Sequence, residues 1–382
     1  MDKKLNIFFS NSISAHKWGG GEKWMIMAAC GLKERGHEVT LSGKANSILL
    51  NKAEEAGLKI LPLNIYADYN PFKIWYTKRI LKREKVDVIM LNLNKDIRVA
   101  GIAARWAKVP VIIARNGIQL FSDKWKHKKT IELVDGIITN SESIRTAYNN
   151  FSWMPKEKTT VIYNGLKMNG TIIEPANIHT IWNIPKDHLI FVAAGRLTRQ
   201  KGFDLLINAT SRLNGTSRPF TVLIAGTGKD RKTLEKQIDE NNLNGNVKLI
   251  GFQNNLSAVI KAADYIIMPS RQEGMPNVVM ESMALGKPIL AANVNGVSEL
   301  MSHRKTGYIF KPMNVNAICE AMHFVLNQHG SDEISNWGVA AKKQVADHFT
   351  LGTMIDRLES YFYEQYGQSP VSYTHLTLPT KA

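Results

Sequence analysis

Two carboxylates eight positions apart, Glu273 and Glu281, stand in the segment 269–288. Pro276 suits the first turn of a helix that extends to about Leu285. Glu273 is then expected in the loop before the helix and Glu281 more than one turn inside it, so the two cannot share a helical face. This separation argues against two carboxylates flanking one glycosidic bond and favours two hydrogen-bonding tasks on an elongated ligand.

The backbone between these carboxylates is a candidate anion site. Gly274, Met275, Pro276 and Asn277 stand at the expected start of the helix. Backbone amides at a helix N-terminus suit a phosphate or the polar edge of a sugar. A Glu that merely caps the helix is the alternative interpretation.

Arg196 and Lys201 follow an apolar run that ends at Gly195. Arg offers a planar fork of donors and Lys a mobile point charge, so together they could neutralise a diphosphate without a metal. A solvated basic turn is the alternative.

Three consecutive glycines, Gly19, Gly20 and Gly21, precede a helix that is expected to begin near Glu22. Glycines let backbone amides approach a phosphate closely at a helix N-terminus. A plain turn explains the same run, and the pattern is not the GxGxxG fingerprint.

These residues follow apolar runs that read as strands buried on both faces, separated by segments with helical spacing. The alternation predicts an α/β fold with two doubly wound parallel sheets, whose ligands bind outside the carboxyl ends of the strands. The runs of the first series are 5–9, 37–41, 58–63, 86–91, 109–114, 135–140 and 159–163. Those of the second series are 188–195, 219–226, 246–252, 263–270, 286–293 and 306–310.

The pattern divides the chain into two Rossmann-like domains, at residues 1–170 and 171–350, followed by a helix at 351–368. We expect this helix to cross back to the first domain. Residues 369–382 continue neither pattern and are interpreted as non-native read-through or a disordered tail.

Composition supports a globular protein in a reducing compartment. Of the 382 residues, 44% are hydrophobic and 21% charged, values that argue against a disordered chain. The two cysteines, Cys30 and Cys319, are too few for a disulfide framework or a cysteine metal site. With no apolar run of about 18 residues, a cytoplasmic location is expected.

The net charge of +16 is concentrated in the first half, with +13 in residues 1–170 and +3 in the rest. Basic residues at 80–87 and 121–130 lie near Trp75, Tyr76 and Trp125. Lys, Arg and Trp together are typical of a membrane interface. This predicts an anionic acceptor or peripheral contact with the inner face of the membrane. A solvated face is the alternative, and no nucleic-acid-binding signature accompanies the charge.

The ordered motifs resemble the retaining glycosyltransferases of family 4, the glycosyl transferases group 1, over roughly residues 5–366. These enzymes have the GT-B fold, in which two Rossmann-like domains face a central cleft. The resemblance rests on residues 19–22, 164–165, 195–202, 225–228 and 273–281.

The resemblance implies a donor site for a nucleotide-diphosphate sugar, with no other cofactor and no metal. By this resemblance, Arg196 and Lys201 would bind the diphosphate of the donor. Glu281 would bind the ribose, and Glu273 the hydroxyls of the transferred sugar. The other residues that it places around the donor are Gly20, Gly21, Gly226, Gly228, Phe252, Gly274, Met275, Pro276 and Asn277. Backbone groups near Phe252 and Gln253 would meet the base.

One departure concerns the histidine that many relatives carry at the end of a strand in the first domain. Here Arg115 and Asn116 stand in its place. Both can contact an acceptor or a sugar, but neither is a good general base near neutral pH. His16, in the glycine loop, is a poor substitute and is expected at the surface.

The preferred interpretation is sugar transfer with retention to a glycan or lipid-linked acceptor in the synthesis of cell-surface polysaccharide or lipopolysaccharide. A nucleotide-sugar hydrolase or epimerase of the same fold is an alternative. A non-catalytic protein that binds a nucleotide sugar or an anionic polymer is another.

Overall fold

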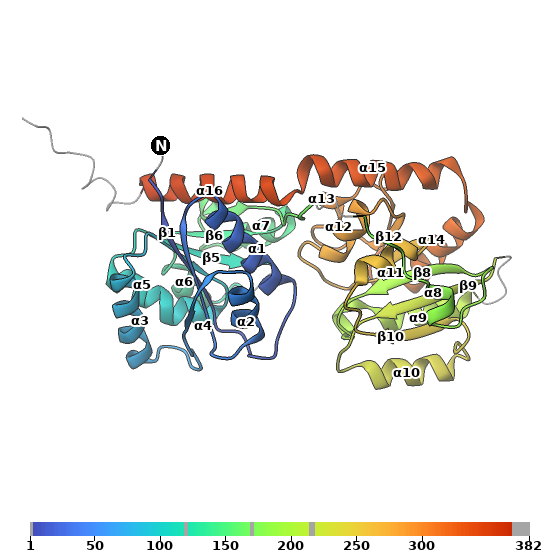
Figure 1. Ribbon diagram of the computed structural model, residues 1–382, viewed down its shortest axis with the longest axis horizontal. Coiled ribbons are helices and arrows are strands. Elements are labelled where there is room, and N and C mark those ends of the chain that lie inside the picture. The colour runs from blue at the N-terminus through green and yellow to red at the C-terminus, as the bar shows by residue number, and fades with distance from the viewer. Residues whose placement is uncertain (1–2, 118–120, 169–171, 214–217, 369–382) are drawn as a thin grey trace, which may run out of the picture. The chain divides into compact units, whose positions relative to one another are not determined.

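A computed structural model describes residues 3–117, 121–168, 172–213 and 218–368 (Figure 1). It forms two compact units. Unit 1 consists of residues 1–165 and 351–382, and unit 2 consists of residues 166–350. The predicted tail at 369–382 lies outside the described residues. The return of the last helix to the first unit is confirmed, and the units divide a few residues before the predicted position at 170.

Unit 1 is built on a seven-stranded parallel sheet with the order β3-β2-β1-β4-β5-β6-β7. β1 pairs with β2 on one side and β4 on the other, so the strand order reverses at β1 and β4. Ligands of such sheets bind at this reversal, beyond the carboxyl ends of the strands. The strands are β1 (Asn6–Asn11), β2 (Glu38–Gly43), β3 (Lys59–Pro62), β4 (Val88–Leu91), β5 (Val111–Asn116), β6 (Gly136–Thr139) and β7 (Thr159–Val161).

Helices cover both faces of this sheet, and two buried apolar clusters form the core, one on each side. This is why the strands read as continuous apolar runs. The helices are α1 (Gly20–Glu34), α2 (Ile48–Glu55), α3 (Pro71–Arg83), α4 (Asn94–Asp96), η1 (Ile97–Gly101), α5 (Ile102–Ala107), α6 (Trp125–Ile131), α7 (Glu142–Asn149), η2 (Lys156–Lys158) and α16 (Leu351–Gln368).

Unit 2 repeats the same plan with the strand order β10-β9-β8-β11-β12-β13, so its reversal lies between β8 and β11. The strands are β8 (Leu189–Ala194), β9 (Phe220–Ala225), β10 (Val247–Gly251), β11 (Tyr265–Met268), β12 (Ile289–Ala292) and β13 (Tyr308–Phe310). The helices are α8 (Ile178–Ile181), η3 (Arg199–Lys201), α9 (Phe203–Arg212), α10 (Arg231–Glu240), α11 (Leu256–Ala262), α12 (Asn277–Ala284), α13 (Val297–Leu300), α14 (Val315–Asn327) and α15 (Asp332–His348).

Each apolar run singled out in the sequence overlaps a strand of one sheet, so the prediction of two doubly wound parallel sheets is confirmed. α12 differs in one detail. Pro276 is the N-cap of α12, with an extended backbone at ψ 110°, and is not its first helical residue. The helix begins at Asn277, which leaves Glu273 in the preceding loop and Glu281 inside the helix, as expected.

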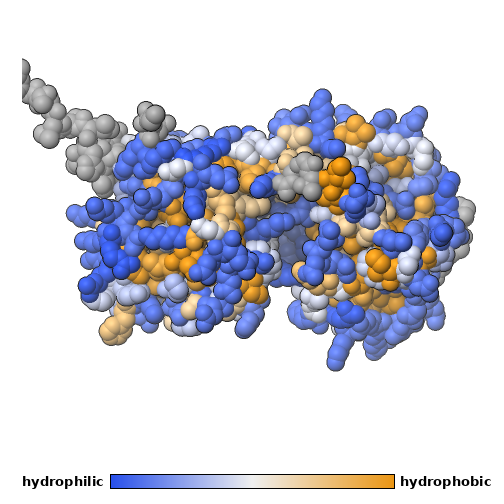
Figure 2. Space-filling model, in the orientation of Figure 1, coloured by the Kyte–Doolittle hydropathy of each residue, from blue (hydrophilic) through white to orange (hydrophobic). Residues whose placement is uncertain are grey.

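The surface shown in Figure 2 is largely hydrophilic on both units, with hydrophobic residues scattered between the polar ones. None of the helices in the described parts of the chain is both long and apolar enough to span a bilayer.

α16 completes the core of unit 1. Its buried face packs against α1 and the sheet, and Ile355 lies so close to Gly31 that a Cβ there would stand 2.6 Å from it. Tyr361 similarly fills the space above Gly136, where a Cβ would lie 1.9 Å from the hydroxyl. The buried side chains of this face are Met354, Ile355, Leu358, Tyr361 and Phe362.

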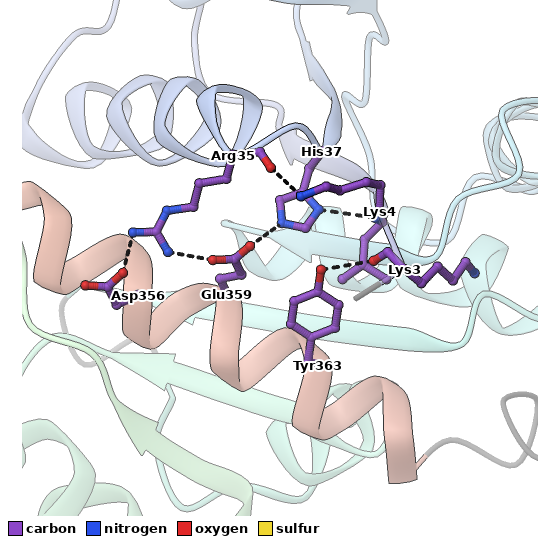
Figure 3. A network of polar contacts seen from close by, with 8 residues as sticks. Lys3, Lys4, Arg35, His37, Asp356, Glu359 and Tyr363 are labelled. Atoms are coloured by element: carbon purple, nitrogen blue, oxygen red, sulfur yellow. Dashed lines mark hydrogen bonds and ion pairs between the residues drawn. The ribbon is translucent and has the colours of Figure 1, made fainter. Parts of the chain in front are cut away.

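A network of ion pairs ties the exposed side of α16 to the end of α1 (Figure 3). Arg35 pairs with Asp356 and, at 2.5 Å, with Glu359. The buried His37 accepts a hydrogen bond from the Leu5 amide on Nδ1, so its Nε2 donates to Glu359 over 2.8 Å. Glu359 therefore joins α16 to Arg35 and His37 at the end of α1, which is distant in the sequence.

Glu359→Gln should destabilise unit 1 in a pH-dependent manner. Burial alone would raise the pKa of Glu359, but hydrogen bonds from Arg35 and His37 outweigh it and lower the pKa. The stabilisation is complete above the ordinary pKa of about 4.3 and is lost as the pH falls through the lowered folded value. We expect the free energy of unfolding to fall by about 1–2 kcal/mol at pH 7. Each kcal/mol lost should lower Tm by roughly 2–4 °C.

Thermal unfolding at pH 7 and near pH 3 measures this effect, with the exposed Glu364→Gln on the same helix as the control. The gap between wild type and Glu359→Gln should shrink at low pH. If Glu359→Gln and Glu364→Gln have equal Tm values at pH 7, the network does not stabilise unit 1.

Candidate active site

The candidate site of unit 2 lies where the strand order reverses, in the loops after β8 and β11. Lys201 closes the short helix η3 in the first loop, and Glu273 stands in the second. Lys201 Nζ donates to Glu273 Oε1 over 2.6 Å, and their side chains are 19% and 8% exposed. The structure thus brings together two residues that the sequence singled out separately.

Ser270 and Asn295 hold Glu273 in place. The Ser270 hydroxyl donates to the same oxygen, Oε1, over 2.6 Å. Asn295 Nδ2 donates to the backbone carbonyl of Glu273, and the amide of Gly296 donates to the carbonyl of Gly274 over 3.0 Å. Sequence reasoning missed Ser270 and Asn295, although both follow strands and could have been found by inspecting every loop at the carboxyl edge.

The two loops are also joined by Arg271. Its guanidinium forms a bidentate ion pair with Asp204, at 2.6 Å for each contact. Its amide donates to the carbonyl of Gln200, and Gln200 Nε2 donates to the carbonyl of Gln272 over 2.9 Å. This clamp fixes the distance between η3 and the loop that carries Glu273.

Glycines let the loops of unit 2 approach backbone to backbone. At Gly202, where φ is +71°, a Cβ would stand 2.0 Å from the carbonyl oxygen of Pro269. At Gly226, where φ is +140°, a Cβ would stand 1.9 Å from the carbonyl oxygen of Gly195. Gly226 therefore lets the loop after β9 contact the loop after β8. Gly228 makes a second such contact, because a Cβ there would stand 2.3 Å from the carbonyl oxygen of Leu197.

The other predicted donor residues differ in how far they are buried. Gly274, Met275 and Pro276 are buried, and Asn277 begins α12. Glu281 is half-buried on α12, whereas Arg196 and Phe252 are exposed. Gln253 donates to the carbonyl of Ile250 over 2.6 Å.

In unit 1, the glycine loop ends on α1, with Gly19 as an N-cap that makes no side-chain hydrogen bond. Gly20 and Gly21 form the first turn. Glu22 is buried and accepts a hydrogen bond from Asn11 at the end of β1, over 3.3 Å. His16 is exposed, as expected.

Arg115 and Asn116 end β5 as buried residues. The guanidinium carbon of Arg115 lies 3.9 Å from the ring centroid of Trp24, and Nη2 donates to Asn164 over 3.2 Å. Burial lowers the pKa of Arg115 to about 10, against the opposing attraction of Glu22. Asn116 Nδ2 donates to the Tyr148 hydroxyl over 3.0 Å, whereas its buried Oδ1 has no hydrogen-bond partner among the described residues.

Sequence reasoning missed Asp96, which follows β4 at the reversal point of this sheet. It is fully buried, and the Ser12 amide donates to both of its oxygens at 3.2 Å. Burial raises the pKa of Asp96 to about 6, although the hydrogen bonds from Ser12 partly oppose this.

Asp96→Asn should therefore raise stability at neutral pH. Because the folded pKa lies above the unfolded value of about 3.9, the protonated form is favoured in the folded state, and stability falls as the pH rises from about 4 to about 6. The amide retains an acceptor for Ser12 but carries no charge. We expect a gain of about 1–3 kcal/mol at pH 7.5 and little change at pH 4.

Urea unfolding at the two pH values measures this gain, with the exposed Asp239→Asn on α10 as the control. A loss of stability at pH 7.5 would show that the charged carboxylate is needed for the fold.

Within the described ranges, no three His, Cys, Asp or Glu residues lie together in a way that could hold a metal ion. The polar groups gathered at the carboxyl edge of unit 2 are those suited to an anionic, hydroxyl-rich ligand. Two Rossmann-like units with such a site are typical of the GT-B glycosyltransferases.

Comparison with known proteins supports the same class. The model of the glycosyl transferases group 1 matches residues 175–344, and that of glycosyltransferase family 4 matches residues 18–169. The chain therefore belongs to the family 4 glycosyltransferases, and it is an enzyme of the GT-B fold.

Among curated relatives, an uncharacterised glycosyltransferase of Methanocaldococcus jannaschii is 30% identical, over 56% of each chain. One of Haemophilus influenzae is 24% identical over 85% of this chain and 91% of its own length. A UDP-Gal:α-D-GlcNAc-diphosphoundecaprenol α-1,3-galactosyltransferase of Escherichia coli is 22% identical over 75% and 77%.

Solved structures show the same fold. A glycosyltransferase of Rickettsia africae superimposes with a TM-score of 0.84 at 20% identity, covering 96% of this chain and all of the other. HepE of Anabaena, in complex with UDP and glucose, superimposes with a TM-score of 0.80 at 19% identity, covering 94% of this chain and all of HepE.

Proposed function

We propose that this enzyme transfers a sugar from a nucleotide-diphosphate donor with retention of the anomeric configuration and without a metal ion. The observation that carries the proposal is the Lys201–Glu273 ion pair at the strand reversal of unit 2. The buried carboxylate of Glu273 holds the ammonium group of Lys201 in a fixed orientation. The ammonium can therefore stabilise the charge on a leaving diphosphate without first having to reorganise.

Each polar residue has a proposed task in this scheme. Lys201 has three donor protons, of which one meets Glu273 and the others are proposed to meet the diphosphate. Arg196, whose side chain is exposed, adds a second cation. Glu273 Oε2 is proposed to accept from hydroxyls of the transferred sugar, and Glu281 from the ribose.

The proposed transfer proceeds on one face of the sugar. The bond from the anomeric carbon to the β-phosphate oxygen breaks, and its electron pair stays on that oxygen. The acceptor hydroxyl bonds to the carbon from the same side and gives its proton to the phosphate. A covalent enzyme intermediate is not part of this proposal, because Glu273 is assigned to the hydroxyls of the transferred sugar and not to its anomeric carbon.

A lipid-linked glycan is the proposed acceptor, in the synthesis of cell-surface polysaccharide. Support comes from the basic first half of the chain and from the diphosphoundecaprenol-linked substrate in the name of the E. coli relative. The HepE complex supports a nucleoside diphosphate in the donor site. The enzyme is proposed to work at the inner face of the membrane.

A panel of nucleotide sugars tests this function. The protein is incubated with each donor, with and without detergent-dispersed lipid-linked glycans, and both free nucleotide and product are measured. Acceptor-dependent release and an NMR coupling constant that matches the donor's anomer are expected. Equal release without acceptor would indicate a hydrolase or epimerase, and binding without turnover would indicate a non-catalytic protein.

Chelation should leave the activity intact. Lys201, Arg196 and the backbone amides near Gly274 already supply the positive charge that a metal would give to the diphosphate. We expect the same kcat in EDTA as in Mg²⁺, measured after dialysis against the chelator. A loss of tenfold or more that Mg²⁺ or Mn²⁺ restores would contradict the metal-independent mechanism.

A further inference from the structure

Unit 1 exposes an unusual group of aromatic side chains. Among the described residues, seven large aromatic side chains of unit 1 are exposed, but only Phe252 in unit 2. Five of the seven fall between positions 66 and 76, on α3 and the loop before it. They are Tyr66, Tyr69, Phe72, Trp75 and Tyr76, and Phe72 is 82% exposed.

Helical spacing aligns these aromatic residues with basic ones. Phe72, Trp75, Tyr76, Arg79 and Arg83 recur at intervals of three, four and seven residues, so they share one side of α3, which we call the α3 face. All five are exposed, whereas Ile74, Thr77, Ile80 and Leu81, on the opposite side of the helix, are buried. α3 lies beside α5 in unit 1 (Figure 1).

The charge of α3 has one sign. Its 13 residues contain five Lys or Arg and no Asp or Glu. The guanidinium carbon of Arg79 lies 4.8 Å from the ring centroid of Trp75, and Lys73 Nζ lies 5.9 Å from that of Tyr76. A solvated helix face normally mixes both charge signs and has few exposed rings. Arg83 pairs over 2.8 Å with Glu84, which directly follows the helix and also pairs with Lys59, so this region keeps a net positive charge. Aromatic rings beside such an excess of basic residues match the headgroup region of an anionic bilayer.

We propose that the α3 face docks unit 1 on the surface of an anionic phospholipid bilayer. The rings of Phe72 and Trp75 enter the headgroup region, and Arg79 and Arg83 meet lipid phosphates. The proposal rests on the proposed lipid-linked acceptor, because docking would hold unit 1 at the surface that contains it. It assigns the contact to α3, which exposes three aromatic rings, rather than to the basic segment 121–130, which exposes only Trp125.

Vesicle co-sedimentation without any donor sugar tests the proposal. Full-length protein is mixed with vesicles of phosphatidylcholine alone or of phosphatidylcholine with phosphatidylglycerol. We expect binding only to the anionic vesicles. Arg79→Gln/Arg83→Gln should weaken it roughly thirtyfold, since each basic residue near such a surface contributes about fivefold. Phe72→Ser/Trp75→Ser should weaken it severalfold and make the remaining binding more sensitive to salt.

Lys342→Gln/Lys343→Gln on α15, which removes the same charge from an exposed part of unit 2, is the matched control and should bind like wild type. The assignment is wrong if this control weakens binding as much as the α3 variants do. It is equally wrong if neutral vesicles bind alike, or if Lys124→Gln/Lys126→Gln/Lys128→Gln/Lys129→Gln abolishes binding while the α3 variants do not.

Turnover with detergent-dispersed acceptor separates this surface from the catalytic proposal. The α3 variants should retain wild-type kcat there and wild-type Tm, because their side chains are exposed and lie outside the donor site. Loss of vesicle binding with intact turnover supports the α3 face. Turnover by a protein that never binds vesicles would overturn it while leaving the transferase function in place.

Discussion

Lys201→Ala should lower kcat by 10- to 100-fold. The ammonium acts on charge that develops on the leaving diphosphate, so its loss raises the barrier by about 1.4 kcal/mol for each factor of ten. The variant also leaves the 8%-exposed Glu273 without its counter-charge, and a smaller loss of stability is therefore expected. Steady-state kinetics and thermal unfolding on the same preparations separate the two effects.

Lys201→Ala/Glu273→Gln distinguishes catalysis from stability. Removing both charges should restore Tm toward that of wild type, while kcat stays low. Lys261→Ala, at an exposed position on α11, is the control for loss of a lysine in unit 2. If Lys201→Ala turns over at nearly the wild-type rate, Lys201 does not stabilise the leaving group.

Gly202→Ala and Gly226→Ala should each destabilise unit 2 by at least about 3 kcal/mol, or about 6 °C or more in Tm. In both, the new Cβ would collide with a backbone carbonyl, at 2.0 and 1.9 Å, and φ is positive. No side chain can move aside to relieve such a contact. Because these glycines join the loops after β8, β9 and β11, surviving protein should also lose donor binding.

Gly245→Ala is the matched control, since a Cβ there would meet nothing within 4 Å. Thermal unfolding and titration with the nucleoside diphosphate compare the three variants. If Gly226→Ala unfolds like Gly245→Ala, the loops of unit 2 are not packed as described.

The fold could be predicted from the sequence because both sheets are covered on two faces. That geometry makes strands such as Val88–Leu91 and Tyr265–Met268 wholly buried and hence apolar throughout. Element ends were harder. Pro276 is compatible with either the cap or the first turn of a helix, and only its ψ of 110° decides between them.

The site was predictable as a set of loops but not as a set of contacts. The rule that ligands meet the carboxyl ends of strands selected Lys201 and Glu273. Their direct pairing across 72 positions depends on the strand order, which places β8 next to β11. The burial of Asp96 could not be predicted, because nothing in the neighbouring sequence distinguishes a buried carboxyl group from a solvated one.

The place of α16 in the chain bears on how unit 1 can form during synthesis. Its five buried side chains contribute roughly 10 kcal/mol, as much as the net stability of a typical domain. They are translated only after all of unit 2, whose residues 166–350 are continuous. Unit 2 can therefore fold as it leaves the ribosome, whereas unit 1 must wait with an open apolar surface along α1. Chaperone demand during translation should fall on the first half of the chain.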